Sequence, residues 1–135
     1  NANLKSGFLV TQACLEGMRA RRWGRIINIS SIAAHLGGVV GPHYAASKAA
    51  IEALTIGLSQ EVAQEGIRVK AVRPGFIYTD IHASGGEPGR VDRIKASVPM
   101  KRGGQADEVA RAILWLLSDE ASYSTGTILD VTGGS

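Results

Sequence analysis

Residues 30–48, SSIAAHLGGVVGPHYAASK, decide how the rest of the chain is interpreted, because a glycine-rich loop here joins an apolar run to a helical pattern. The stretch ends with Tyr44 and Lys48 four positions apart, so on a helix their side chains lie on one face about one turn apart. A phenol ordinarily keeps its proton at neutral pH. A fixed ammonium one turn away favours the phenolate form.

Ser31 stands at the end of the apolar run, thirteen positions before Tyr44. Ligands of parallel sheets bind at the carboxyl ends of the strands. A loop between the two residues would therefore bring the Ser31 hydroxyl beside the Tyr44 hydroxyl. This arrangement is suited to proton exchange with a carbonyl or alcohol oxygen.

Apolar periodicity outside this stretch predicts alternating helices and strands. We expect long helices at 3–21, 43–65 and 106–118, strands at 25–30, 69–72 and 127–131, and a short helix near 90–97. Strand, helix and strand at this spacing indicate a right-handed parallel crossover. Residues 76–105 are polar and follow a parallel strand, which makes them a candidate substrate lid.

Composition and charge exclude several classes of protein. The formal net charge is +3, and one cysteine with three scattered histidines gives no metal-ligand spacing, so we expect no metal. The sequence has no apolar run long enough to span a bilayer and no signal-peptide pattern. We therefore expect a cytoplasmic protein without a membrane partner.

Two other patterns invite a functional interpretation. Four arginines at 19, 21, 22 and 25 resemble a nucleic-acid patch, but no aromatics interleave with them. A basic helix terminus that complements the helix dipole explains them better, so we expect no nucleic-acid partner. The Gly85–Gly89 run lacks the Gly-Lys-Ser/Thr ending of a phosphate loop and is better explained as a surface loop.

The motif around Tyr44 resembles the active-site segment of the classical short-chain dehydrogenase/reductase family, in which a serine precedes Tyr-x-x-x-Lys at this distance. Four further segments match in the same order. Residues 3–7 (NLKSG) are similar to the family's helix whose Asn completes a catalytic tetrad, and residues 26–31 are similar to the strand that ends at the catalytic serine. Residues 73–79 are similar to the Pro-Gly segment that lines the nicotinamide. Residues 125–126 and 133–134 are similar to the closing strand region.

The resemblance covers essentially the whole chain and corresponds to the C-terminal half of a family member. It implies an α/β fold, namely the C-terminal half of a Rossmann-like doubly wound parallel sheet in three α/β/α layers. Residues 1–135 would then form a single partial domain that carries the catalytic and nicotinamide side.

The resemblance also implies roles for individual residues. Tyr44 would exchange the proton, Lys48 would support it and hold the nicotinamide ribose, Ser31 would bind the substrate oxygen, and Asn3 would anchor a water that relays protons to Lys48. The implied cofactor is NAD or NADP. Its nicotinamide would be contacted by Tyr44, Lys48, Pro74, Gly75, Ile77 and Thr79, through the backbone at 77 and the hydroxyl at 79.

Our interpretation is an oxidoreductase that interconverts a secondary alcohol and a ketone, active only with the N-terminal half present. We expect a small-molecule carbonyl or alcohol substrate and a homo-oligomer, dimer or tetramer. The oligomer contact would use small residues of the second helix outside its core stripe, at 45, 46, 49, 50 and 57. The alternatives are reduction of another carbonyl or imine, an epimerase-like reaction, a non-catalytic half-domain or assembly module, and a phosphate-binding protein.

Overall fold

The structure is a computed structural model that describes residues 2–32, 41–78 and 89–135, with only the backbone described for residues 2, 3 and 90. Its helices are α1 (Ala2–Arg21), α3 (Pro42–Val62), α5 (Arg90–Ile94) and α6 (Ala106–Leu117), with 3₁₀ turns at Ala63–Glu65, Lys95–Ser97 and Asp119–Ala121. The strands are β1 (Gly24–Ile29), β2 (Ile67–Pro74), β3 (Ile77–Tyr78), β4 (Gly104–Gln105) and β5 (Ile128–Val131).

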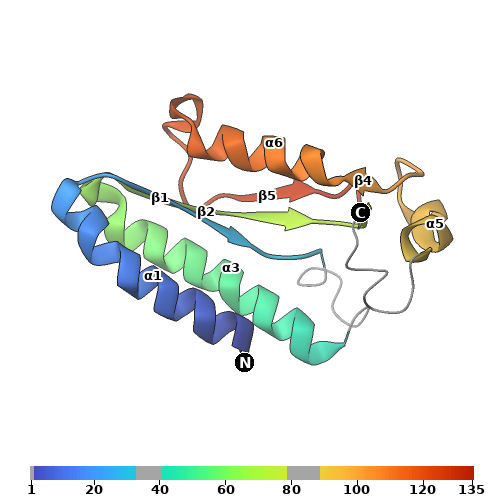
Figure 1. Cartoon of the computed structure of the whole chain (residues 1–135), viewed down its shortest axis with the longest axis horizontal. Helices are drawn as coiled ribbons and strands as arrows, with labels where there is room; N and C mark the ends of the chain where they lie inside the picture. The colour runs from blue at the N-terminus through green and yellow to red at the C-terminus, as the bar shows by residue number, and fades with distance from the viewer. Residues whose placement is uncertain (1, 33–40, 79–88) are drawn as a thin grey trace.

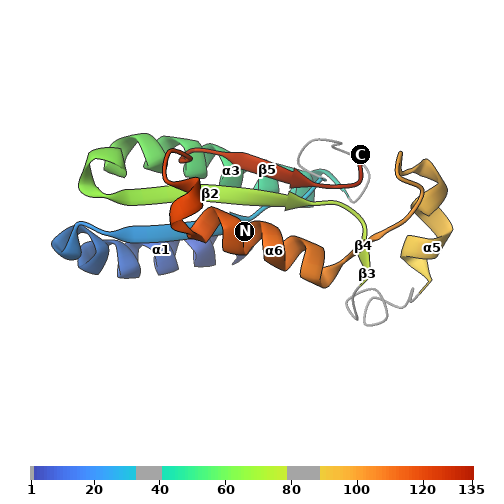
Figure 2. The same ribbon diagram turned by 90° about the horizontal axis from the view of Figure 1, so that it is seen from above.

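The elements form three layers, with α1 and α3 on one face of the main sheet and α6 on the other (Figure 1). The main sheet of the described residues has the order β1-β2-β5, and both pairings are parallel. The carboxyl ends of all three strands therefore lie at the same end of the sheet, which we call its carboxyl edge. The short parallel pair β3-β4 and helix α5 lie beyond that edge (Figure 2). The predicted α/β class and layering are confirmed.

The core forms around β2, the central strand. Its side chains Ile67, Val69, Ala71 and Val72 are almost fully buried, as expected for a parallel strand covered on both faces. Leu58 and Val62 of α3 pack against Ile67 and Val69. The predicted helices and strands therefore appear within a few residues of their expected bounds, and β2 extends further at both ends.

Four sequence expectations need correction. Phe8 of α1 and Leu117 of α6 fit the apolar periodicity of their helices, which predicts that both face inward, but both are exposed. Ala45 is buried in the core of this chain and is not part of an outer helix surface. The candidate lid 76–105 is not irregular throughout, because β3 and β4 pair within it. Residues 79–88 of that segment lie outside the described part of the chain.

Lys70 is the one charged side chain in the described core that is fully buried. Its Nζ donates to the backbone carbonyls of Leu116 and Ala121, which lie in and after α6. Burial first, and then the positive charges of Arg68 and Arg25, lower the pKa of the Lys70 ammonium from 10.5 to about 8. The folded state thus favours neutral Lys70 more than the unfolded state does.

We expect the free energy of unfolding to rise between about pH 8 and pH 10.5, since the unfolded chain there holds a proton that the folded chain has lost. Below about pH 8 both states are protonated and this contribution is constant. The rise should total about 3 kcal/mol and should be absent in Lys70→Met. Urea unfolding of the wild type and of Lys70→Met, each as the full-length protein, measures the free energy of unfolding across this pH range. Parallel pH curves for the two variants would contradict the prediction.

None of the helices in the described ranges is both long and apolar enough to cross a membrane. Across those same ranges, no three histidine, cysteine or acidic side chains gather in a way that could hold a metal ion.

Candidate active site

The predicted Tyr44–Lys48 pair forms on the first turns of α3. Pro42 stands at the helix start, where its fixed φ suits helix entry. The Lys48 ammonium lies 5.7 Å from the centroid of the Tyr44 ring. Tyr44 is 39% exposed, so a phenol and an ammonium lie together at a surface that a substrate can reach.

A hydrogen bond to the end of β1 holds the Lys48 side chain in place. Its Nζ donates to the Ile29 carbonyl at 3.0 Å, which fixes the ammonium at the carboxyl end of the strand. An ammonium has three donors, so this contact leaves others for a ligand. The same contact explains why the ammonium of a lysine one turn after Tyr44 on α3 keeps its position.

Ser31 is the second residue after the end of β1, at the same sheet edge, and is half-buried. The next residue, Ile32, donates its backbone N–H to the Pro74 carbonyl at 2.9 Å. This bond joins the segment that carries Ser31 to the end of β2, where the Pro-Gly segment begins.

Two other predicted site residues, Asn3 and Thr79, are not fully described by the structure, and a third, Ile77, is. Thr79 lies in an undescribed segment, and only the backbone of Asn3 is described, near the start of α1. Ile77 is described and lies in β3, half-buried.

The Pro74-Gly75 segment is packed tightly against the chain after β5. The Gly75 N–H donates to the Val131 carbonyl at 2.9 Å. A Cβ added at Gly75 would lie 2.9 Å from Cα of Thr132, too close for any residue but glycine without movement of the backbone. The glycine thus allows the end of β2 to lie close to the chain after β5 at the carboxyl edge of the sheet.

A partly buried polar cluster lies at the same edge, and the sequence did not predict it. The Glu52 carboxylate accepts from Ser30 Oγ at 2.5 Å and from Arg73 Nε and Nη2 at 3.1 and 2.7 Å. Arg73 Nη1 also donates to Asp130 Oδ1 at 2.7 Å. The hydrogen bonds that Arg73 donates to Glu52, together with the charges of Glu52 and Asp130, raise the pKa of the Arg73 guanidinium. No local sequence pattern signals the cluster, because Glu52, Arg73 and Asp130 come from α3, β2 and β5.

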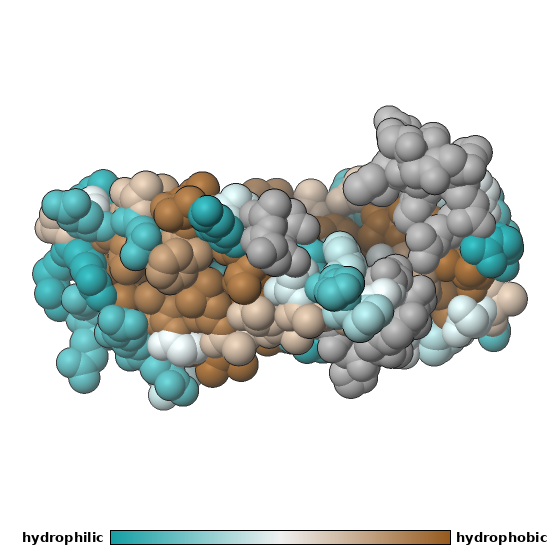
Figure 3. Space-filling view, turned by 90° about the horizontal axis from the view of Figure 1, so that it is seen from below, coloured by the Kyte–Doolittle hydropathy of each residue, from teal (hydrophilic) through white to brown (hydrophobic). Residues whose placement is uncertain are grey.

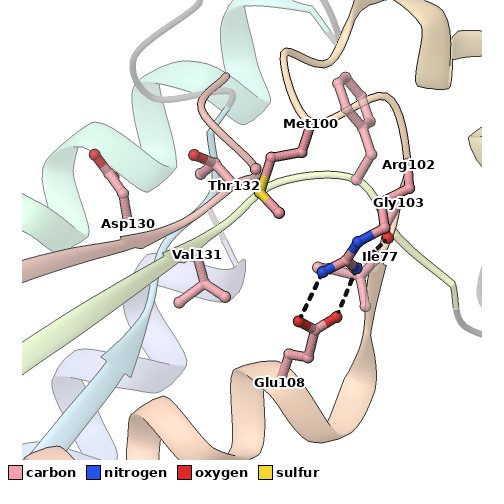
Figure 4. A pocket seen from close by; sticks show the side chains of 11 residues that line it. Ile77, Met100, Arg102, Gly103, Glu108, Asp130, Val131 and Thr132 are labelled. Atoms are coloured by element: carbon pink, nitrogen blue, oxygen red, sulfur yellow. Dashed lines mark hydrogen bonds and ion pairs between the residues drawn. The ribbon is translucent and has the colours of Figure 1, made fainter.

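A pocket of about 240 Å³ opens beside this cluster, between the ends of β2 and β5 and the start of α6 (Figure 4). Its wall includes Ile77, Met100, Asp130 and the ion pair of Arg102 with Glu108, whose two bonds measure 2.8 and 3.1 Å. Hydrogen bonds from Arg102 and from the Gln105 backbone hold the pKa of the exposed Glu108 carboxyl down at about 2. The pocket borders the segment predicted to line the nicotinamide.

Comparison with known proteins agrees with this geometry. A family model described as "Enoyl-(Acyl carrier protein) reductase" matches residues 1–135. The "uncharacterized oxidoreductase YgfF" of Escherichia coli (strain K12) is 56% identical over 139 residues, which cover 99% of this chain and 56% of that protein. The chain belongs to the short-chain dehydrogenase/reductase family.

Other relatives support the same membership. The 3-oxoacyl-(acyl-carrier-protein) reductase FabG of Pseudomonas aeruginosa is 42% identical over 134 residues, 99% of this chain and 54% of that protein. The crystal structure of a 3-oxoacyl-(acyl-carrier protein) reductase from Brucella melitensis superimposes with a TM-score of 0.90 at 41% identity, covering 98% of this chain and 49% of that one. The chain spans about half the length of the curated relatives it matches.

Family membership confirms the resemblance drawn from the motif around Tyr44 and the Rossmann-type fold. Of the predicted site residues, the described ones gather at the carboxyl edge of the sheet: Ser31, Tyr44, Lys48, Pro74, Gly75 and Ile77. Their individual roles are proposals, to which we now turn.

Proposed function

We propose that this chain is the catalytic half of an oxidoreductase that transfers a hydride between a nicotinamide cofactor and a secondary alcohol or ketone. The observation that carries the proposal is the Lys48 ammonium held 5.7 Å from the Tyr44 ring centroid and bonded to the end of β1. A phenol beside a fixed cation at a strand end is in position to give a proton to a carbonyl oxygen and to take it back.

Each residue has one task in this mechanism. The Tyr44 hydroxyl gives a proton to the carbonyl oxygen during reduction and takes it back during oxidation. Lys48 stabilises the phenolate by its charge. Ser31 donates a hydrogen bond to the substrate oxygen and so orients the carbonyl toward Tyr44. Asn3 would anchor the water through which Lys48 exchanges protons with solvent.

The residues present fit a nicotinamide nucleotide, NAD or NADP. Lys48 has donors left for ribose hydroxyls after its bond to Ile29. Pro74 and Gly75 end β2 at the same edge, and Ile77 and Thr79 would contact the nicotinamide amide group. When bound, the cofactor supplies or accepts the hydride.

The full-length protein should oxidise NADH or NADPH only in the presence of a carbonyl compound. Absorbance at the reduced nicotinamide band, measured against a panel of ketones, β-ketoacyl thioesters, aldehydes and imines, tests this expectation. The relatives named for reduction of 3-oxoacyl groups make the thioesters the first substrates to try. No carbonyl-dependent absorbance change with either cofactor would overturn the proposal.

The second candidate function is a non-catalytic half-domain or assembly module, and one observation favours it. Within the described residues β1 pairs with β2 alone and leaves its other edge open, and Ile29 of that strand is exposed. An open apolar strand edge invites association. Both functions can hold together if another segment of the full-length protein covers this edge.

Residues 1–135 expressed alone should therefore bind reduced nicotinamides weakly. A dinucleotide lies across two βαβαβ halves, and no Gly-x-x-x-Gly-x-Gly turn, the pattern that holds the diphosphate, follows β1, β2 or β5 in this sequence. Fluorescence titration of NADH and NADPH into the isolated segment and the full-length protein measures the difference. Stoichiometric micromolar binding by a folded, monomeric segment would show that the rest of the protein is dispensable.

We also propose a homo-oligomer, dimer or tetramer, in which α1 and α3 pair across a twofold axis. Figure 3 shows apolar side chains gathered over these helices on the face away from the sheet. Phe8, Leu9 and Val10 of α1 and Ile56 of α3 are exposed, and Ala46, Ala49 and Gly57 leave α3 open to close approach. Light scattering that finds only a monomer for the full-length protein would contradict this.

A further inference from the structure

The partly buried cluster at the sheet edge joins the helix that carries Tyr44 and Lys48 to the strand that ends at Pro74. Glu52 lies one turn after Lys48 on α3, and Arg73 is the residue immediately before Pro74. Arg73 donates two hydrogen bonds to the Glu52 carboxylate, one of 3.1 Å to Oε2 and one of 2.7 Å to Oε1. A planar guanidinium bound to both carboxylate oxygens fixes the relative orientation of the two side chains as well as the distance between them.

This pair is shielded from water. The side chains of Arg73 and Glu52 are only 18% and 14% exposed, whereas the Arg19–Glu65 pair is 42% and 33% exposed. Screening is weak at such sites, so the Arg73–Glu52 attraction is stronger than that of a surface pair. The pair is therefore able to hold two elements in a defined relation.

Two further contacts extend the cluster to the remaining strands. Ser30, the residue before Ser31, donates its hydroxyl hydrogen to Glu52 Oε2 at 2.5 Å. On the other side, Arg73 donates to Asp130 of β5 at 2.7 Å. One glutamate and one arginine thus connect α3 with the carboxyl ends of β1, β2 and β5.

We propose that Glu52 and Arg73 are positioning residues that set the distance between the Tyr44–Lys48 turn of α3 and the Pro74-Gly75 wall. The inference rests on the proposed function, in which the turn holds the proton donor and the wall holds the nicotinamide. Proton and hydride must reach the two atoms of one carbonyl. A displacement of the wall against the turn therefore affects the chemical step more than it affects binding.

The test is the Glu52→Gln variant of the full-length protein, which keeps the side-chain shape and removes the charge. We expect kcat to fall about 10- to 100-fold, because small misplacements of reacting groups have effects of this size. The Kd of the reduced cofactor should change less than about 3-fold, since the long Lys48 side chain adjusts to a small shift. A purely structural role for the pair would lower the unfolding temperature and leave kcat at low temperature unchanged.

Four further variants complete the experiment. Arg73→Gln and the double variant Glu52→Gln/Arg73→Gln should lose no more kcat than Glu52→Gln alone, since partners in one contact are not additive. Glu65→Gln is the matched control, because Glu65 also accepts from an arginine, at 3.0 Å, in the turn after the far end of α3; its kcat should be normal. If Glu52→Gln does not fold, Glu52→Asp keeps the charge and should show a smaller loss of kcat.

The outcomes separate this inference from the function it rests on. A wild-type protein that turns over, with normal kcat in Glu52→Gln, overturns the positioning role and leaves the proposed function in place. A wild-type protein without nicotinamide-dependent turnover overturns both. Additive losses in the double variant would also contradict a shared role for the pair.

Discussion

Tyr44→Phe in the full-length protein is expected to reduce kcat by about 10²- to 10⁴-fold, the usual contribution of one positioned acid or base. The substitution removes only the hydroxyl oxygen. The ring, which lies 5.7 Å from Lys48 Nζ, remains to fill its place on α3. Cofactor binding should therefore stay within about 2-fold of wild type, because the phenol acts in the chemical step and contributes little to holding the dinucleotide.

Steady-state turnover and a fluorescence titration with the reduced cofactor measure these two quantities. Tyr123→Phe is the matched control, since Tyr123 is fully exposed and the change of atoms is identical. Its kcat should equal that of wild type. Near-normal turnover in Tyr44→Phe would show that another group transfers the proton, and the mechanism would be wrong.

Lys48→Met is expected to damage catalysis and cofactor binding together. The variant keeps most of the side-chain length but loses the charge beside Tyr44 and the donor to the Ile29 carbonyl. Loss of the charge should lower kcat by about 10²-fold or more, because the phenolate is no longer stabilised. Loss of the donors to the ribose should raise the Kd of the cofactor about 10-fold, the effect of one or two charged hydrogen bonds.

The contrast with Tyr44→Phe is the informative result, because only the lysine should change both quantities. Lys95→Met serves as the control, since Lys95 is an exposed lysine that pairs with Asp92 at 3.5 Å. A Lys48→Met variant that loses turnover but binds the cofactor normally would remove the ribose contact from the proposal and keep the role beside Tyr44.

Much of the fold follows from local pattern. The run at 67–72 (IRVKAV) is rich in β-branched residues, which favour a strand. Gly66 at the end of the second helix adopts a φ of 76°, as a helix-ending glycine commonly does. The pairing of β3 with β4 was not predictable, because two-residue strands have no period and depend on contacts far apart in the sequence.

The exposed apolar residues illustrate a second limit. Phe8 and Leu117 fit helical stripes in the sequence, yet both are exposed in the folded chain. Periodicity shows which residues share a face of a helix but not whether this chain covers that face. Lys70 is the converse case, since a lysine in a strand pattern gives no sign that α6 will bury it against two carbonyls.

The sequence by itself determined the family, the parallel α/β class and the pairing of Tyr44 with Lys48, because these depend on spacing along one helix and on motifs in chain order. Only the tertiary structure decided that Glu52, Arg73 and Asp130 meet under the same edge. They come from α3, β2 and β5, and the register of parallel strands places Arg73 opposite Asp130. Contacts between elements distant in sequence arise from packing, and no local pattern of residues encodes them.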